Sequence, residues 1–343
     1  MSFKYQLEAS EPQQFEGGTN RAVTRQNISS LKDMAIYSLQ IAPGCLRELH
    51  WHPNASELSY CLQGQGTMGI LSPEGDNATF EIGAGSVSFV PMGYFHYIRN
   101  TGSQTLRVIA AFTHEDPEHL DLSESLDYVP REFLAETFAV PPSTFPDLPK
   151  RGDRFLVKLG TMATGTSASG NGGSDASTRP YTCKLEQLAP NVYEGGTVKE
   201  LGVTEIPRLE GITLFSLHAE PRSLREPHWH PNAAELNYCL RGTAQIGIVA
   251  PNGERETFVV EAGDVAFIPQ NYFHYIASTS DEPMNFLVFF SNIRPNHIDL
   301  SQSFDWFRRE VIAASFGVDP QVFASLPKRG DVFIAAKRKF AVV

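Results

Sequence analysis

Short runs of apolar residues, each bounded by Gly, Pro, Asn or Asp, dominate the middle of both halves of the chain. Examples are MAIYSLQI at 34–41, ELSYCL at 57–62 and LRVIAAF at 106–112. Their lengths and their content of aromatic and β-branched residues favour strands over helices. The turn sequences PEGDN at 73–77 and PNGE at 251–254 predict hairpins. Many short antiparallel strands at this spacing predict a sandwich or barrel, so the expected class is all-β.

Two later segments have a different pattern. DYVPREFLAETF at 127–138 and DWFRREVIAASF at 305–316 are predicted to form helices, with Asp or Ser nearby to cap their N-termini. Each segment follows the strand-rich part of its own half. We expect these helices to pack against the other half or against a neighbouring subunit.

The chain contains an internal repeat, because adding 178 to a residue number maps the first half onto the second. HWHPNA at 50–55 recurs at 228–233, and PKRGD at 149–153 recurs at 327–331. The register holds without a gap from about residue 5 to about residue 157. A duplicated gene would produce this pattern, so we expect two copies of one fold.

A segment rich in Gly, Ser, Thr and Ala separates the two copies, at residues 159–179. It has almost no large apolar side chains and therefore cannot bury enough surface to fold by itself. We interpret it as a flexible linker. The predicted domains are residues 1–158 and residues 180–343.

Composition and charge exclude several classes of protein. The formal net charge of −11 over 343 residues argues against nucleic acid as a partner, because binding phosphates needs surplus Lys and Arg. The four cysteines form no CxxC pair. No stretch reaches the roughly 18–20 apolar residues of a membrane span, so no membrane association is expected. The N-terminus lacks an apolar signal core, which predicts a cytoplasmic protein, although a signal removed by processing would leave no trace.

Four residues in each copy have the spacing of a metal site. On a strand, His50 and His52 place both imidazoles on one face, and Glu57 and His96 follow. The second copy keeps every interval, with His228, His230, Glu235 and His274. A single His-x-His pair is more often an ordinary surface or core pair, but four ligand types repeated at identical spacing indicate a metal. Three imidazoles and a carboxylate suit a divalent transition metal with open coordination positions, and the absence of thiolate makes structural zinc less suitable.

The residues around these ligands resemble the two motifs of the cupin superfamily. The motif G-x5-H-x-H-x4-E-x6-G is matched by Gly44, His50, His52, Glu57 and Gly64. The motif G-x5-P-x-G-x2-H-x3-N is matched by Gly85, Pro91, Gly93, His96 and Asn100. The second copy keeps its ligands but has Arg222, Asn271 and Ser278 in place of two glycines and the final Asn. The resemblance implies two tandem cupin jelly-roll β-barrels, each followed by short helices. Because Asn tolerates left-handed backbone, the turn at Asn271 can survive.

Within this superfamily the whole chain is similar to the bicupin oxalate decarboxylases, given its two barrels, RELHWH at 47–52 and a helical tail after each barrel. The resemblance implies Mn2+ at both sites, cleavage of oxalate to formate and CO2, and a homo-oligomer, either a trimer or a hexamer. It also implies that Arg47 and Arg225 contact the substrate, since a guanidinium offers a rigid donor fork to a carboxylate. The alternative role for Arg47 is a salt bridge with a neighbour such as Glu48. The ligand types alone leave Fe, Ni, Cu and Zn open.

In that family a Glu on a lid after the last His ligand donates the proton. Here the corresponding stretch, FTHEDPEHLDLS at 112–123, offers Glu118 and, as the less favoured candidate, Glu115. It lacks the usual Ser-Glu-Asn signature and is slightly shorter, so a solvated loop charge is the alternative for both. The second copy has FSNIRPNHIDLS at 290–301, without a glutamate. We therefore expect turnover at the first site, with the second as a structural or auxiliary metal centre.

Two pairs of residues recur near these lids, and three other functions stay open. We expect structural roles, at the junction of loop and helix, for His119, Asp121, His297 and Asp299. Without an effective proton donor the chain could act as an oxalate oxidase, which yields CO2 and hydrogen peroxide. Other cupin chemistry on a small carboxylate is a second alternative. A manganese-binding bicupin without turnover is the third.

Overall fold

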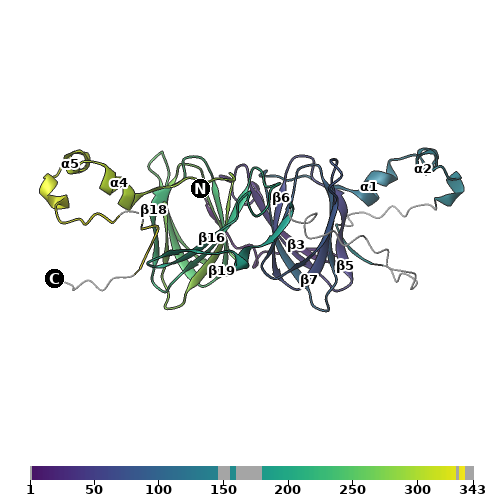
Figure 1. The fold of residues 1–343 in the computed structure, drawn as a ribbon, viewed down its shortest axis with the longest axis horizontal. Helices are drawn as coiled ribbons and strands as arrows, with labels where there is room; N and C mark the ends of the chain where they lie inside the picture. Colours follow the sequence, from purple (N-terminus) through teal and green to yellow (C-terminus); the bar gives the residue numbers. More distant parts are fainter. Residues whose placement is uncertain (1, 146–154, 160–179, 330–331, 337–343) are drawn as a thin grey trace.

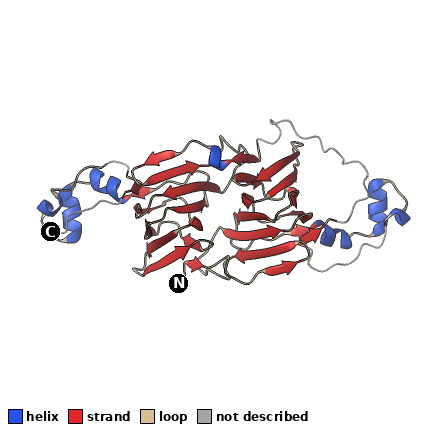
Figure 2. Cartoon of the chain, turned by 90° about the horizontal axis from the view of Figure 1, so that it is seen from below, coloured by secondary structure: helices blue, strands red, loops and turns tan. Residues whose placement is uncertain are grey.

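The computed structural model describes residues 2–145, 155–159, 180–329 and 332–336. Two β-rich bodies lie side by side at the centre, and helices project from their outer ends in opposite directions (Figures 1 and 2). Each body is a pair of sheets. The predicted all-β class with two tandem jelly-roll copies, each followed by short helices, is confirmed, although the sheets do not close into barrels.

The first copy is built from a seven-stranded and a six-stranded sheet. The seven-stranded sheet has the order β14 (Thr182–Lys184), β9 (Ser86–Val90), β6 (Glu57–Gln63), β11 (Leu106–Phe112), β4 (Ala35–Ile41), β3 (Gly18–Val23) and β2 (Gln13–Phe15). The six-stranded sheet has the order β12 (Leu120–Asp121), β5 (Cys45–Trp51), β10 (Phe95–Asn100), β7 (Gln65–Leu71) and β8 (Ala78–Gly83), with β13 (Leu156–Lys158) also beside β5. The predicted hairpin at 73–77 is confirmed between β7 and β8.

The second copy repeats this arrangement. Its seven-stranded sheet has the order β1 (Lys4–Tyr5), β22 (Val265–Ile268), β19 (Glu235–Arg241), β24 (Met284–Phe290), β17 (Thr213–Ala219), β16 (Gly196–Glu200) and β15 (Asn191–Tyr193). Its six-stranded sheet has the order β21 (Arg255–Glu261), β20 (Thr243–Val249), β23 (Phe273–Ser278), β18 (Leu224–Trp229) and β25 (Ile298–Asp299), with β26 (Ile334–Ala335) also beside β18. The hairpin predicted at 251–254 is confirmed between β20 and β21.

The copies exchange one short strand each. Strand β1, near the start of the chain, pairs with β22 of the second copy, and β14, which follows the predicted linker, pairs with β9 of the first. A short 3-10 helix, η2 (Leu185–Gln187), follows β14. The domain borders 1–158 and 180–343 stay a prediction, and residues 160–179 of the predicted linker lie outside the described residues.

Apolar side chains form three clusters, one inside each copy and one between the copies. Strand β4 contributes to two of them, because Ile36 faces the cluster between the copies and Leu39 faces the inside of the first copy. The cluster between the copies joins residues from both seven-stranded sheets, such as Phe89 on β9 and Phe289 on β24. These sheets are therefore covered on both faces, which explains why their strands read as nearly continuous apolar runs.

The predicted helices each form two short helices instead of one. The first copy has α1 (Leu122–Asp127), α2 (Arg131–Phe138) and the 3-10 turn η1 (Pro142–Thr144), and the second has α4 (Leu300–Trp306), α5 (Arg309–Phe316) and η3 (Pro320–Phe323). Pro130 separates α1 from α2, because the residue before a proline avoids the helical region. The helices project away from the opposite copy, so the expected packing against the other half is wrong (Figure 1). No helix in the described part of the chain is long and apolar enough to cross a bilayer.

Candidate metal centres

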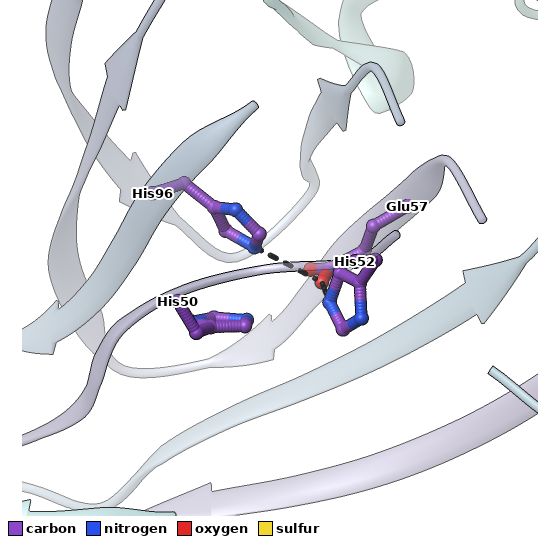
Figure 3. A group of neighbouring side chains, drawn as sticks. All are labelled: His50, His52, Glu57 and His96. Carbon is purple, nitrogen blue, oxygen red and sulfur yellow. Dashed lines mark hydrogen bonds and ion pairs between the residues drawn. The ribbon is translucent and has the colours of Figure 1, made fainter. Parts of the chain in front are cut away.

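The four predicted ligands of the first copy come together between its two sheets. His50 lies on β5 directly opposite His96 on β10, and His52 follows the end of β5. Glu57 reaches them from the other sheet, as the first residue of β6. Figure 3 shows the four side chains converging on one point. All four are buried, and their candidate ligand atoms lie within 4.8 Å of one another.

The second copy builds the same cluster. His228 on β18 lies opposite His274 on β23, with His230 just beyond β18 and Glu235 at the start of β19. These side chains are also buried, with candidate ligand atoms within 4.8 Å. The structure thus brings together all eight residues that the sequence predicted as metal ligands.

Backbone carbonyl groups fix the orientation of each imidazole in the first copy. His50, His52 and His96 place Nδ1 at 2.7, 2.7 and 2.9 Å from the carbonyl oxygens of Glu48, Glu118 and Tyr94, respectively. Because a carbonyl oxygen can only accept, each Nδ1 carries the hydrogen and donates it. Each Nε2 is then left with a free lone pair, which is the arrangement found in metal-binding histidines.

The second copy has the same supports and an additional close contact between two imidazoles. His228, His230 and His274 place Nδ1 at 2.7, 2.8 and 2.9 Å from the carbonyl oxygens of Glu226, Asn296 and Tyr272. The Nε2 atoms of His228 and His230 lie only 3.2 Å apart. With both hydrogens on Nδ1, two lone pairs face each other, which is unfavourable unless a cation lies between them.

The donor set fits a divalent transition metal in both copies. In the first copy, Oε2 of Glu57 lies 3.2 Å from Nε2 of His52 and 3.4 Å from Nε2 of His96. Protonating a histidine would relieve the repulsion among these acceptors, but protonation is unfavourable here. Burial lowers the pKa of His52, and burial together with the nearby Arg47 lowers the pKa of His50 well below its ordinary value. Three neutral imidazoles and one carboxylate are a suitable set for such an ion.

Glu57 and Glu235 differ in the group that donates a hydrogen bond to their second carboxylate oxygen, Oε1. The Ser59 hydroxyl donates to Oε1 of Glu57, whereas the Asn237 amide donates to Oε1 of Glu235 at 2.7 Å. Burial opposes ionisation of Glu57, but the neighbouring imidazoles lower its pKa below its ordinary value. The carboxylate is therefore ionised and held in place, as a metal ligand needs to be.

Arg47 lies beside the first cluster but pairs with Asp121, across a distance of 2.6 Å. Its guanidinium also donates to the carbonyl oxygen of Phe155 at 3.2 Å and lies 3.9 Å above the centre of that ring. The alternative salt bridge to Glu48 does not form, since the Glu48 carboxylate accepts a hydrogen bond from Ser123 at 2.9 Å. Arg47 is fully buried, so its charge acts in a medium of low polarity.

Arg225 has the same surroundings in the second copy. It donates to Asp299 at 2.8 Å and to the carbonyl oxygen of Phe333 at 3.1 Å. Asp121 and Asp299 stand at the N-cap positions of α1 and α4 but cap neither helix with their side chains. Their pairing with the arginines was not predicted from the sequence, although their recurrence in both copies was a signal.

The two lid glutamates have different surroundings. The Glu115 carboxylate accepts from Arg25 at 3.2 Å and from the Asp33 amide at 3.0 Å. Burial raises the pKa of Glu115, but the amide donors and Arg25 outweigh it and lower the pKa overall. Glu118 is exposed, and its carboxylate makes no hydrogen bond or ion pair in the described part of the chain. Its carbonyl group, however, holds His52, which places this residue next to the cluster.

Asn54 anchors the lid to the metal-binding loop, a role that no sequence motif predicted. Its side-chain amide donates to the carbonyl of Asp116 at 3.1 Å and accepts from the Glu118 amide at 2.9 Å. Asn232 makes both equivalent bonds to the corresponding segment of the second copy. The backbone of the lid is thus fixed in both copies.

The second copy tolerates its two missing motif glycines. Asn271 has a φ of 68°, close to the 81° of Gly93, and its amide donates to the carbonyl of His230 at 3.0 Å. The prediction that this turn survives is confirmed. Arg222 has a φ of 58° where Gly44 has 72°, so the strained backbone is kept there as well.

Comparison with known proteins agrees with this geometry. The sequence model of the cupin family matches residues 5–144 and 185–323. An oxalate decarboxylase of Bacillus subtilis is 28% identical over 289 residues, which cover 84% of this chain and 74% of that protein. A probable oxalate decarboxylase of Arthroderma benhamiae is 26% identical over 342 residues, covering 97% of this chain and 83% of the relative.

Solved structures agree as well. A structure of Bacillus subtilis oxalate decarboxylase, from work on the Mn(II) centres of that enzyme, superposes with a TM-score of 0.86. Its sequence is 25% identical, and the match covers 98% of this chain and 89% of that one.

Proposed function

This chain belongs to the cupin family, as a bicupin that resembles oxalate decarboxylases, and we propose that it cleaves oxalate to formate and CO2 at the first metal centre. The observation that carries the proposal is the cluster of four buried acceptors with Arg47 and Glu118 beside it. The second centre, which has Asn296 in place of Glu118, serves as a structural or auxiliary site.

We propose manganese as the ion in both centres, since the similar Bacillus subtilis enzyme has Mn(II) centres. The ligands would be His50, His52, Glu57 and His96 in the first copy and their four counterparts in the second. When bound, the ion supplies a Lewis acid for a carboxylate oxygen and a one-electron redox couple.

Arg47 binds the substrate in this proposal. A guanidinium carries five N–H donors, and the contacts to Asp121 and Phe155 leave donors for a small dianion. Asp121 and the ring of Phe155 fix the guanidinium in one orientation, so little of its freedom remains to be lost on binding. Arg225 is the corresponding residue of the second copy.

Glu118 donates the proton in this proposal. The C–C bond of oxalate breaks, CO2 leaves, and the remaining carbon forms a C–H bond with the proton from Glu118. Oxalate dianion and one proton thus give formate and CO2 without net oxidation. Because Glu118 is exposed, water can return its proton after each cycle. Glu115 is less suited, since Arg25 and the Asp33 amide occupy its carboxylate.

Product analysis of the purified, manganese-loaded protein tests this function. We expect formate and CO2 in equal amounts from oxalate. Hydrogen peroxide with CO2 and no formate would instead identify an oxalate oxidase. Bound manganese without any product from oxalate would overturn the proposal and favour a metal-binding bicupin without turnover.

A further inference from the structure

Ion pairs hold the lid of the first copy, the stretch at residues 112–123. The Arg25 guanidinium, just after β3, contacts the carboxylates of Glu115 and Asp116, each at 3.2 Å. The Arg25 backbone amide also donates to the carbonyl oxygen of Glu115 at 3.2 Å, and the Asp33 amide donates to the Glu115 carboxylate at 3.0 Å. One arginine and two backbone amides thus fasten this lid to the segment between β3 and β4.

The second copy replaces these charges with apolar side chains. The 178-residue offset places Val203 at the position of Arg25 and Ile293 at the position of Glu115. Both side chains are partly buried against the apolar cluster between the copies. Arg294 stands at the position of Asp116, so the charge there is reversed. The second lid is therefore held by burial of apolar surface and not by ion pairs at these positions.

The first lid acts on the metal centre because its backbone orients one of the ligands. The Glu118 carbonyl oxygen accepts a hydrogen bond from Nδ1 of His52 at 2.7 Å, only two residues after the second ion pair. Asn54 fixes the segment between them, and Asn232 fixes the corresponding segment of the second copy. The ion pairs of Arg25 are therefore an anchor that the first lid has and the second lacks.

These ion pairs are open to screening by dissolved salt. The side chain of Arg25 is 57% exposed, and that of Asp116 is 38% exposed. Ions in solution weaken the attraction between charges that are exposed to this degree, and such pairs stabilise only weakly even without salt. Apolar burial involves no charges, so screening does not weaken the contacts of Val203 and Ile293.

We propose that Arg25 is a positioning residue for the first metal centre, which acts through the lid to hold His52 in the orientation that a metal ion needs. Because this anchor is ionic, the first centre releases its ion faster as the salt concentration rises, and the second centre does not. The assignment rests on the proposed metal ion in both centres and not on the proposed cleavage of oxalate. It makes two centres with identical ligands differ in how firmly they hold the ion.

The release of manganese to an excess of chelator tests this assignment, with one complete centre at a time. His274→Ala leaves the four ligands intact only in the first centre, and His96→Ala leaves them intact only in the second. In the His274→Ala background we expect Arg25→Ala to accelerate release about fivefold at low salt, and Arg25→Lys to restore part of the loss. In the His96→Ala background Arg25→Ala should change nothing. Val203→Ala is the matched control, which should affect the second centre alone.

Salt tests the role of charge without any change at Arg25. Raising NaCl from about 0.05 M to about 0.5 M shortens the screening length roughly threefold. We expect this to accelerate release from the first centre and to leave the second nearly unchanged, and we expect Arg25→Ala to abolish the difference. Amide hydrogen exchange should also rise with salt at residues 114–118 and stay constant at residues 292–296, because only the first lid loses an anchor.

The outcomes separate this assignment from the proposed function. Release from the first centre that responds neither to Arg25→Ala nor to salt would overturn the positioning role. Equal acceleration at both centres would overturn it too, since that would indicate a general loss of stability. If the wild-type protein binds no manganese, the assignment fails together with the proposed metal. A manganese-loaded protein that makes no formate from oxalate, but shows the expected salt response, would support the assignment and overturn only the proposed function.

Discussion

At the scale of single residues, chemical role follows from what a side chain contacts. Glu115 and Glu118 are three positions apart on one lid, yet only Glu115 has both carboxylate oxygens engaged. Glu118 contributes its carbonyl group to His52 and leaves its carboxylate in solvent. Arg47 likewise forms its ion pair with Asp121 and not with its sequence neighbour Glu48. Contacts between distant segments thus separate residues that look equivalent in the sequence.

Replacement of the two lid glutamates tests this distinction. We expect Glu118→Gln to lower the rate of formate production about a hundredfold or more, because the amide cannot donate a proton to carbon. Its metal content should match that of the wild type. Glu115→Gln is the control, with a smaller loss, since it alters an anchor of the lid. Wild-type rates in Glu118→Gln would contradict the proposed proton donor.

Buried thiols predict a loss of stability at alkaline pH. Burial raises the pKa of Cys239 to about 12 and that of Cys61 to about 11. Both thiols are exposed in the unfolded chain, where they titrate near pH 8.5–9. Above that pH the unfolded state loses protons that the folded state keeps, so the free energy of unfolding falls as the pH rises toward 11–12.

Urea unfolding at pH 8 and pH 10 measures this effect. We expect Cys239→Ala to lose about 1–2 kcal/mol less between the two pH values than the wild type, because it lacks one of the titrating groups. Equal losses in the two proteins would show that this thiol does not titrate differently on unfolding.

At the scale of elements, much of the structure follows from local patterns in the sequence. The predicted strands at 34–41, 57–62 and 106–112 match β4, β6 and β11 within one residue at each end. Because of the internal repeat, the ligand spacing of the first copy recurs in the second, so the first site predicted the second. The turn at Asn271 was predictable because its left-handed backbone depends on that one residue.

Other elements depend on contacts that one sequence does not reveal. Strand β1 has two residues, and it forms because β22 of the other copy offers an edge. The ion pair between Arg47 and Asp121 joins residues far apart in the chain. Because Asp121 stands directly before a helix, its sequence position suggests a capping role and not an ion pair. The helix predicted at 305–316 begins earlier and breaks after Trp306, where no proline marks the break.

The two hydrogen bonds between Asn54 and the lid are predicted to support turnover at the first site. We expect Asn54→Ala to lower formate production about tenfold, because two hydrogen bonds that hold the lid beside His52 are lost, with each contributing roughly 1 kcal/mol. Asn232→Ala, which removes the equivalent bonds of the second copy, is the matched control and should leave turnover nearly unchanged. Equal losses in both variants would contradict turnover at the first site alone.

At the scale of the whole molecule, the two copies form one body with a shared core. Their seven-stranded sheets pack against each other through one apolar cluster, and β1 and β14 each add to the sheet of the opposite copy. The projecting helices lie at the two far ends, away from the opposite copy (Figure 1). The outer surfaces, and not the junction, are therefore available for other subunits.

The homo-oligomer stays a prediction, and the projecting helices are the place to test it. Tyr128 and Trp306 are 88% and 84% exposed, and further aromatic side chains of the same helices are also in solvent. Clustered apolar groups of this kind mark protein interfaces. Light scattering after size exclusion should give the mass of a trimer or hexamer, and Trp306→Asp should reduce it. Val192→Asp, at an exposed position outside the helices, is the control. A wild-type mass of 37.9 kDa would contradict the prediction.

We propose that each copy holds one metal ion in its cluster of three histidines and a glutamate. Metal analysis after manganese loading and gel filtration tests it most directly, with His119→Ala as a control for a recurring histidine outside the clusters. We predict two ions per chain in the wild type and in His119→Ala, and one in each of His96→Ala and His274→Ala. A wild-type protein without bound metal, or two ions retained in both ligand variants, would show that these clusters are not the metal sites.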